Sequence, residues 1–237
     1  MSIRSIFVTG ANQGLGYHTV RNLAKTPNVL VFLGARDLSK AEEALAKFAA
    51  DVHPSSTVVP TLIDLTDEKT IKTAAESTAK ILKEKGAAGL DALVNNAAIA
   101  QGPDALVYAT NVAGTVAVKN AFYPLLTTTG GAAIVNVSST LGSLKWHTER
   151  PAPPVYGAYS ASKSALNSFT LQWTIEEEQR KSGIRVVSIC PGYNATNLNG
   201  HGGTKDPADG SMVIVKEALA TEGESGRFFN EEGPIGW

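Results

Sequence analysis

Near its start the chain reads Thr9-Gly10-Ala11-Asn12-Gln13-Gly14-Leu15-Gly16, directly after a short apolar run from Ile3 to Val8. This order of strand, glycine turn and helix is typical of a site for the pyrophosphate of a dinucleotide. The glycines let backbone N–H groups approach the phosphates, and the helix directs its positive end at them. The spacing is G-x-x-x-G-x-G rather than the commoner G-x-G-x-x-G. Taken alone, an ordinary turn between a strand and a helix remains an alternative.

Length and composition indicate a single globular unit. The chain has 237 residues, a net charge of −1 and 43% hydrophobic residues, which predicts one α/β domain over residues 1–237, substrate loops included. No basic block indicates a nucleic-acid partner, and no apolar run is long enough to span a membrane. The early strand leaves no room for a signal peptide, and the one cysteine, Cys190, excludes an internal disulfide. We therefore expect a cytoplasmic protein.

Short apolar runs alternate with helical patterns along the chain. Most of the runs are apolar at successive positions, as in strands that are buried on both faces of a parallel sheet. We expect strands at 3–8, 29–34, 57–63, 92–95, 133–138, 185–189 and near 226–229. Helices are expected at 14–25, 39–50, 67–85, 109–126, 158–181 and 212–221. This alternation predicts a doubly wound, mainly parallel sheet of seven strands with helices on both faces.

Two stretches have no clear periodicity, and both follow the carboxyl ends of expected strands. Ser143–Val155 contains Pro151, Pro153 and Pro154, and Pro191–Gly210 is rich in Gly and Asn. Open α/β sheets bind their ligands at this edge, so these stretches could contact a substrate, although a plain surface loop is an equal alternative for any one residue. The candidates for a substrate pocket are Trp146, His147, Tyr156, Tyr193, Asn194 and His201. No cluster of residues has the spacing of a metal site.

Tyr159 and Lys163 are four residues apart in an expected helix, which places them on the same face, one turn apart. A free phenol titrates near 10, and lowering that pKa to near 7 costs roughly 4 kcal/mol. A cation about 4 Å away can supply about this much. We therefore interpret Tyr159 as a general acid/base. Tyr156 is a natural comparison, because the residue four positions after it, Ser160, carries no charge.

Serines end one of the expected strands, in Asn136-Val137-Ser138-Ser139-Thr140-Leu141-Gly142. A hydroxyl at this edge can donate a hydrogen bond to a substrate carbonyl and polarise it. Neither serine stands in an evident relation to a histidine and an acid, so we do not interpret them as nucleophiles. Capping of the turn by either serine is the structural alternative.

Taken together, these motifs resemble the short-chain dehydrogenase/reductase family, in its compact single-domain branch with carbonyl-reductase-type and C-factor-type members. The matching residues follow in the family's order and at compatible spacings: Thr9-Gly10-x-x-x-Gly14-x-Gly16, Asn95-Asn96-Ala97, Asn111, Ser139, Tyr159-x-x-x-Lys163, and Pro191-Gly192 with Thr196. The resemblance implies a Rossmann-type NAD(P)-binding domain. It also implies an oxidoreductase that transfers a hydride between nicotinamide and a carbonyl or alcohol carbon.

The resemblance assigns a catalytic role to each matched position. Tyr159 would be the general acid/base, and Lys163 would lower its pKa and hold the nicotinamide ribose. Ser139 is the better match for the catalytic serine, because it stands three residues before Gly142. Asn111 would maintain a water-linked proton path. The implied cofactor-binding residues are Gly10, Asn12, Gln13, Gly14, Leu15, Gly16, Arg36, Asp64, Leu65, Asn96, Ala97, Tyr159, Lys163, Pro191, Gly192 and Thr196.

The end of the second strand bears on the choice of cofactor. NAD-binding relatives have an acid there to hold the ribose diol, whereas this chain has Ala35 followed by Arg36. A guanidinium suits a 2′-phosphate in charge and geometry, so we expect NADP(H). Asp37 favours the alternative, NAD(H), because it lies near the usual distance of a ribose acid from the glycine turn.

Some features depart from the family or leave other functions open. Ala98 stands where the family usually has glycine, and the segment from Asn96 to Asn111 is shorter than in most relatives. That segment contributes to tetramer packing in the family, so a homo-oligomer, dimer or tetramer, is less firmly implied. A dinucleotide-sensing regulator without turnover is an alternative function, although it would not need Asn111, Ser139, Tyr159 and Lys163 together. A sugar-nucleotide epimerase would need a larger C-terminal domain.

Overall fold

A computed structural model describes residues 3–127, 130–149 and 156–237. Its centre is one eight-stranded sheet with the strand order β3-β2-β1-β4-β5-β6-β7-β8. The first seven strands are parallel, and the eighth runs antiparallel to the seventh. Their bounds are β1 Arg4–Val8, β2 Val29–Ala35, β3 Thr57–Leu62, β4 Ala92–Asn95, β5 Ala133–Val137, β6 Arg185–Ile189, β7 Arg227–Asn230 and β8 Gly233–Pro234.

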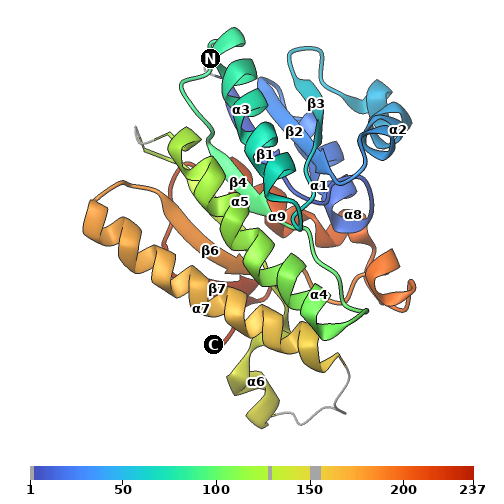
Figure 1. Cartoon of the computed structure of the whole chain (residues 1–237), viewed down its shortest axis with the longest axis vertical. Coiled ribbons are helices and arrows are strands. Elements are labelled where there is room, and N and C mark those ends of the chain that lie inside the picture. The colour runs from blue at the N-terminus through green and yellow to red at the C-terminus, as the bar shows by residue number, and fades with distance from the viewer. Residues whose placement is uncertain (1–2, 128–129, 150–155) are drawn as a thin grey trace.

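Helices cover both faces of the sheet (Figure 1). Strand β1 shows how the sequence achieves this, because successive side chains point to opposite faces of a strand. Ile6 and Val8 pack with α1, α2 and α9, while Phe7 packs with α3, α5 and α7. The bounds are α1 Gly14–Ala24, α2 Leu38–Phe48, α3 Glu68–Glu84, α4 Asp104–Tyr108, α5 Thr115–Phe122, α6 Leu144–Glu149, α7 Gly157–Arg180, α8 Pro207–Gly210 and α9 Met212–Leu219. The predicted doubly wound architecture is confirmed.

The differences from the expected elements are local. Strand β8 has two residues, too few to show any periodicity. The helix expected at 109–126 begins earlier, at Asp104, and changes into a π-helical segment, Ala109–Gly114, before α5. Helix α6 lies inside a stretch that we expected to be irregular, and the three prolines of that stretch lie outside the described residues. At α3 the expectation is confirmed, because the Asp67 side chain caps the helix by accepting from the Lys69 N–H at 2.9 Å.

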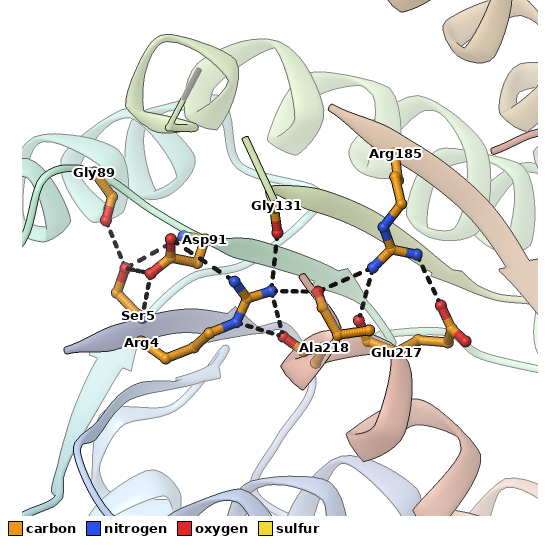
Figure 2. Close-up of polar contacts among 9 residues, drawn as sticks. Arg4, Ser5, Gly89, Asp91, Gly131, Arg185, Glu217 and Ala218 are labelled. Carbon is orange, nitrogen blue, oxygen red and sulfur yellow. Dashed lines mark hydrogen bonds and ion pairs between the residues drawn. The ribbon is translucent and has the colours of Figure 1, made fainter. Parts of the chain in front are cut away.

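At the amino ends of the strands, two arginines bind the end of α9 (Figure 2). Arg4, the first residue of β1, donates to the carbonyl oxygens of Gly131 at 3.0 Å, Ala218 at 3.1 and 3.0 Å and Ala220 at 2.8 Å. Arg185, the first residue of β6, donates to the Glu217 carboxylate at 2.9 Å and to the Ala220 carbonyl at 3.1 Å. The last carbonyls of a helix lack partners within it, so these guanidinium groups satisfy them. At this edge of the sheet, the two guanidinium groups and the carbonyl oxygens that they bind are therefore hydrogen-bonded within the chain.

Within the described residues, every helix is too short or too polar to cross a bilayer.

Candidate active site

A cleft of about 540 Å³ opens at the opposite edge, where the parallel strands end. It lies at the junction of β1 and β4, from which the strand order runs outward in both directions. Open α/β sheets bind ligands at such a switch point. The lining includes every residue that the sequence analysis proposed for cofactor binding: Gly10, Asn12, Gln13, Gly14, Leu15, Gly16, Arg36, Asp64, Leu65, Asn96, Ala97, Tyr159, Lys163, Pro191, Gly192 and Thr196.

The glycine turn forms one wall of the cleft, and its geometry requires glycine. Gly10 and Gly14 have φ angles of +62° and +55°, which other residues adopt only at a cost. A Cβ on Gly16 would overlap the Gly10 carbonyl and lie 2.5 Å from Nδ2 of Asn96. Asn96 holds the turn by donating to the carbonyls of Thr9 at 2.8 Å and Gly10 at 3.1 Å. The turn is therefore a fixed backbone cradle, and this observation fits the phosphates of a dinucleotide.

Helix α1 begins at this cradle without a side-chain cap. Its N-cap residue, Gln13, instead accepts from the Asn197 amide at 2.8 Å, across the cleft mouth. Thr196 lies beside the turn as well, since a Cβ on Gly14 would be 3.4 Å from its side chain. The first turn of α1 and the loop after β6 line the same cleft. The N–H groups of a first helical turn lack partners within the helix, as an anion site requires.

Two cationic side chains stand at the end of β2. Arg36 and Lys40 both line the cleft, and within the described residues neither forms an ion pair. Asp37, between them, caps α2: its Oδ1 accepts from the Ser39 hydroxyl at 2.7 Å and the Ser39 N–H at 3.0 Å. The Ser39 hydroxyl and the Lys40 backbone hold the pKa of Asp37 below its usual value. One carboxylate oxygen of Asp37 is thus engaged within α2.

Another part of the cleft wall follows β3. Asp64 and Leu65 line it together with Thr66. The Asp64 carboxylate accepts from the Thr66 N–H at 2.8 Å and from its hydroxyl at 2.7 Å, which closes a tight turn after the strand.

Tyr159 and Lys163 lie on one face of α7, as their spacing predicts, and both side chains are buried at the cleft wall. Nζ of Lys163 is 5.6 Å from the centre of the Tyr159 ring. The same ammonium donates to the Val137 carbonyl of β5 at 2.7 Å. The two groups are therefore neighbours, but the nearest polar partner of Lys163 is a backbone carbonyl.

Burial dominates the pKa of Tyr159, and the expectation that Lys163 lowers that pKa stays a prediction. Burial raises the pKa of the Tyr159 phenol above its usual value, and the nearby Cys190 thiol adds to this, while the hydrogen bond with Ser139 opposes it. Burial also lowers the pKa of Lys163 to about 8. The physical reason is desolvation, because removing both groups from water disfavours both charged forms. The i, i+4 spacing indicates that the side chains of Tyr159 and Lys163 are close together, but it does not indicate that both are removed from water.

The two serines after β5 have different surroundings. The Ser138 hydroxyl donates to Oδ1 of Asn167 at 2.7 Å in the interior. The Ser139 hydroxyl lies close enough to the Tyr159 phenol to lower its pKa, and it accepts from the Leu141 N–H at 3.2 Å. The hydroxyls of Ser139 and Tyr159 therefore meet at one point of the cleft.

Asn111 lies in the π-helical segment and does not line the cleft. Its amide accepts from the Ile99 N–H and donates to the Ile99 carbonyl, both at 2.9 Å, and it donates to the Ser162 hydroxyl at 3.0 Å. Ser162 in turn donates to the carbonyl of Tyr159 at 2.7 Å. Asn111 thus ties the segment after β4 to the tyrosine turn of α7. The expectation that Asn111 maintains a water-linked proton path stays a prediction.

A buried chain of polar side chains joins β4, β5, β6 and α7 behind the cleft. Each consecutive pair is hydrogen-bonded, over distances of 2.7–3.0 Å: Asn95, Asn136, Thr170, Ser188, Asn167 and Ser138. Buried polar groups of this kind need all their partners in place. The chain therefore fixes α7 against the strand that carries Ser139. It also accounts for Asn95 within the central sheet.

Of the six residues that the sequence analysis proposed for a substrate pocket, three line the cleft and three do not. Tyr156, Tyr193 and Asn194 line the cleft, whereas Trp146, His147 and His201 do not. His147 instead points a ring nitrogen at the Leu141 carbonyl, 2.9 Å away. Several lining residues escaped the sequence analysis: Lys40, Ile99, Leu106, Leu141, Asn197 and Leu198. Lys40 could have been found, because it is a second cation four residues after Arg36 and lies in the first turn of α2. Among the described residues, no group of three His, Cys, Asp or Glu side chains could hold a metal ion.

A doubly wound sheet with a glycine cradle at its switch point, and a tyrosine–lysine pair beside it, defines a dinucleotide-dependent oxidoreductase. Comparison with known proteins agrees: residues 4–206 match the family model described as short chain dehydrogenase. The chain belongs to the short-chain dehydrogenase/reductase family, whose members are NAD(P)-dependent oxidoreductases acting on small molecules.

The individual proteins that resemble this chain are described as dehydrogenases or reductases as well. The chain is 33% identical to the short-chain dehydrogenase anuI of Penicillium roqueforti, covering 95% of this chain and 92% of that protein. It is 30% identical to an NADP-dependent 3-hydroxy acid dehydrogenase of Schizosaccharomyces pombe, covering 83% and 73%. Among solved structures, the NADPH-bound carbonyl reductase from chicken fatty liver matches with a TM-score of 0.80, 32% identity and full coverage of both chains.

Proposed function

We propose that this protein is an NADP(H)-dependent oxidoreductase that transfers a hydride between the nicotinamide and a carbonyl or alcohol carbon. The observation that carries the proposal is the meeting of the Ser139 and Tyr159 hydroxyls in the same cleft as the glycine cradle. Bound NADP(H) supplies or accepts the hydride. The protein's own residues position the carbonyl and move the proton.

In this proposal Tyr159 is the acid of the reductive direction. A tyrosine phenol is protonated at neutral pH, and this is the form that donates a proton to the developing alkoxide. Ser139 donates a hydrogen bond to the same oxygen and orients the carbonyl. Lys163 holds the nicotinamide ribose, and its positive charge favours the alkoxide as it forms. Asn111 is a positioning residue that acts through Ser162 and the turn of Tyr159.

The preference for NADP(H) rests on the end of β2. Arg36 and Lys40 supply two cations at the cleft edge, which suits a 2′-phosphate. Asp37, which would favour NAD(H), has one carboxylate oxygen engaged in capping α2. The two relatives named above with NADP or NADPH in their descriptions support the same preference.

We assign the other cofactor contacts to the predicted lining residues. The glycine turn would hold the pyrophosphate, Asp64 and Leu65 would contact the adenine, and Pro191, Gly192 and Thr196 would meet the carboxamide side of the nicotinamide. The lining residues are drawn from positions 10 to 199 of the chain, so residues 1–237 would work as one domain that includes the substrate loops.

The test is NADPH consumption, followed by absorbance, with a panel of aldehydes, ketones and quinones. We expect turnover that falls about 10³-fold in Tyr159→Phe. Tyr156→Phe is the matched control, since it removes a phenol from the same cleft and should keep most of the activity. Turnover surviving in Tyr159→Phe would contradict the mechanism. Tight binding of NADPH without turnover of any carbonyl would favour the regulator instead.

A further inference from the structure

We propose that the substrate is an uncharged carbonyl compound, or its alcohol, with a flat apolar body that is held between Tyr156 and Tyr193. This inference rests on the proposed oxidoreductase function and names the class of substrate for the same site.

Charge is distributed unevenly along the cleft. The four charged lining residues Arg36, Asp37, Lys40 and Asp64 follow β2 and β3, on the nucleotide side of the switch point. On the other side, among the described lining residues that follow β4, β5 and β6, the only charged one is Lys163. Its ammonium is buried and bound to the Val137 carbonyl. A substrate carboxylate or phosphate would lose water there without gaining a free cation from the described residues, which is unfavourable.

Large apolar side chains are exposed on this uncharged side. Leu106, Tyr156, Tyr193 and Leu198 are 45%, 37%, 57% and 36% exposed, and all four line the cleft. Exposed apolar side chains that gather in a concave site mark the place of an apolar ligand. Two of the four are tyrosines, whose rings offer flat faces to an aromatic partner.

Tyr156 also has a backbone conformation that a large side chain disfavours. Its φ is +61° and its ψ is 44°, in the left-handed region, at the start of α7. A non-glycine residue there costs about 1–2 kcal/mol, and such strain is typical of functional positions. A glycine at position 156 would adopt this conformation without strain. The chain nevertheless has a tyrosine there and places its glycine at the next position, Gly157. The ring of Tyr156 stands nearly perpendicular to that of Tyr159, with the centres 6.5 Å apart, so it borders the reacting hydroxyl.

The first experiment compares two substrates of the same shape. Methyl 4-formylbenzoate is neutral and 4-formylbenzoate is charged, and both have the same aldehyde on a flat ring. With NADPH as the reductant, we expect kcat/KM to be at least about tenfold higher for the ester, because the carboxylate finds no free cation. Equal or better turnover of the carboxylate would overturn the inference.

The second experiment changes the two tyrosines. Tyr156→Gly should raise KM for the ester at least about fivefold while leaving the Tm unchanged or higher, because it removes both the ring and the strain. Tyr193→Ala should raise KM similarly. Leu144→Ala is the matched control, since Leu144 is a more exposed apolar residue outside the cleft lining. An unchanged KM in both tyrosine variants would overturn the role of the tyrosines.

The two proposals can fail separately. Absence of turnover with every carbonyl would contradict the oxidoreductase function. In that case, binding of the two benzoates to the NADPH complex, followed through nicotinamide fluorescence, would still decide the inference. Preferential binding of the ester would support an uncharged apolar ligand, and equal or tighter binding of the carboxylate would contradict it.

Discussion

The two edges of the sheet use polar side chains in opposite ways. At the amino ends of the strands, Arg4 and Arg185 are bound to carbonyls and carboxylates of the same chain (Figure 2). At the carboxyl ends, Arg36 lines the cleft without an ion pair among the described residues, and Tyr156 keeps a strained backbone. Groups that satisfy each other stabilise a fold, whereas unsatisfied groups are available to a ligand. Stability and function are thus assigned to opposite ends of the same strands.

Substitutions of the neighbouring residues Ser138 and Ser139 test this separation of stability from function most directly. Ser139→Ala should lower kcat roughly 10²- to 10³-fold and leave the Tm unchanged, because it removes a donor at the reacting oxygen. Ser138→Ala should keep kcat within a few-fold but cost about 1–2 kcal/mol of unfolding free energy, because Asn167 loses a buried partner. Steady-state kinetics and thermal unfolding of both variants measure this. The reverse outcome would show that Ser138 is the serine that meets the substrate.

A substitution at the opposite edge should affect stability alone. Arg4→Ala leaves three carbonyls and Asp91 without their guanidinium partner and should destabilise the fold by about 3 kcal/mol. For a chain of this length that lowers the Tm by roughly 6–12 °C. The kcat of the folded protein should stay unchanged, and Arg4→Lys should restore only part of the loss. A fall in kcat without a change in Tm would contradict the separation of the two edges.

Because Lys163 has a shifted pKa in the folded protein, its titration should make the unfolding free energy depend on pH. Its pKa is lowered from the ordinary 10.5 to about 8 in the folded protein. Between these values the unfolded chain binds more protons than the native one, so the unfolding free energy rises with pH, by at most about 3 kcal/mol. Above pH 10 the raised pKa of Tyr159 reverses the trend. Urea denaturation from pH 7 to 10, without nucleotide, should show the rise in the wild type and not in Lys163→Met.

The smallest expected effect is at the nucleotide end of the cleft. Arg36→Ala should raise KM for NADPH about 10- to 50-fold through the loss of a charge-assisted hydrogen bond, and leave KM for NADH nearly unchanged. Lys40→Ala should act in the same direction, more weakly, because a lysine contacts phosphate as a point charge. An unchanged ratio of the two KM values would contradict the assignment of NADP(H).

Much of the fold could be predicted, because strands buried on both faces have a characteristic sequence. The apolar run of β1 and the glycine turn after it identify the switch point and therefore the position of the cleft. Helix α6 was missed because it is six residues long and lies in a proline-rich stretch. The π-helical segment was missed because it depends on packing between helices rather than on periodicity.

The site could be predicted as a set of residues, but less well as a set of interactions. Spacing brings Tyr159 and Lys163 to one helix face, yet the partner of the ammonium is Val137, from a distant strand. Desolvation depends on the complete surroundings of a group, so the direction of the Tyr159 pKa shift could not be read from sequence. Asn111 illustrates the same limit, because its amide turns to Ile99 and Ser162.

The buried polar chain from Asn95 to Ser138 has a consequence for how the protein folds. Its amides and hydroxyls come from four elements, so their hydrogen bonds depend on how α7 lies along β5 and β6. A slip of that helix by a single position would strand Asn136 and Asn167 unpaired in the interior, at a penalty that apolar contacts alone would not impose. The position of α7 behind the active site is therefore penalised for misalignment whether or not a ligand is bound.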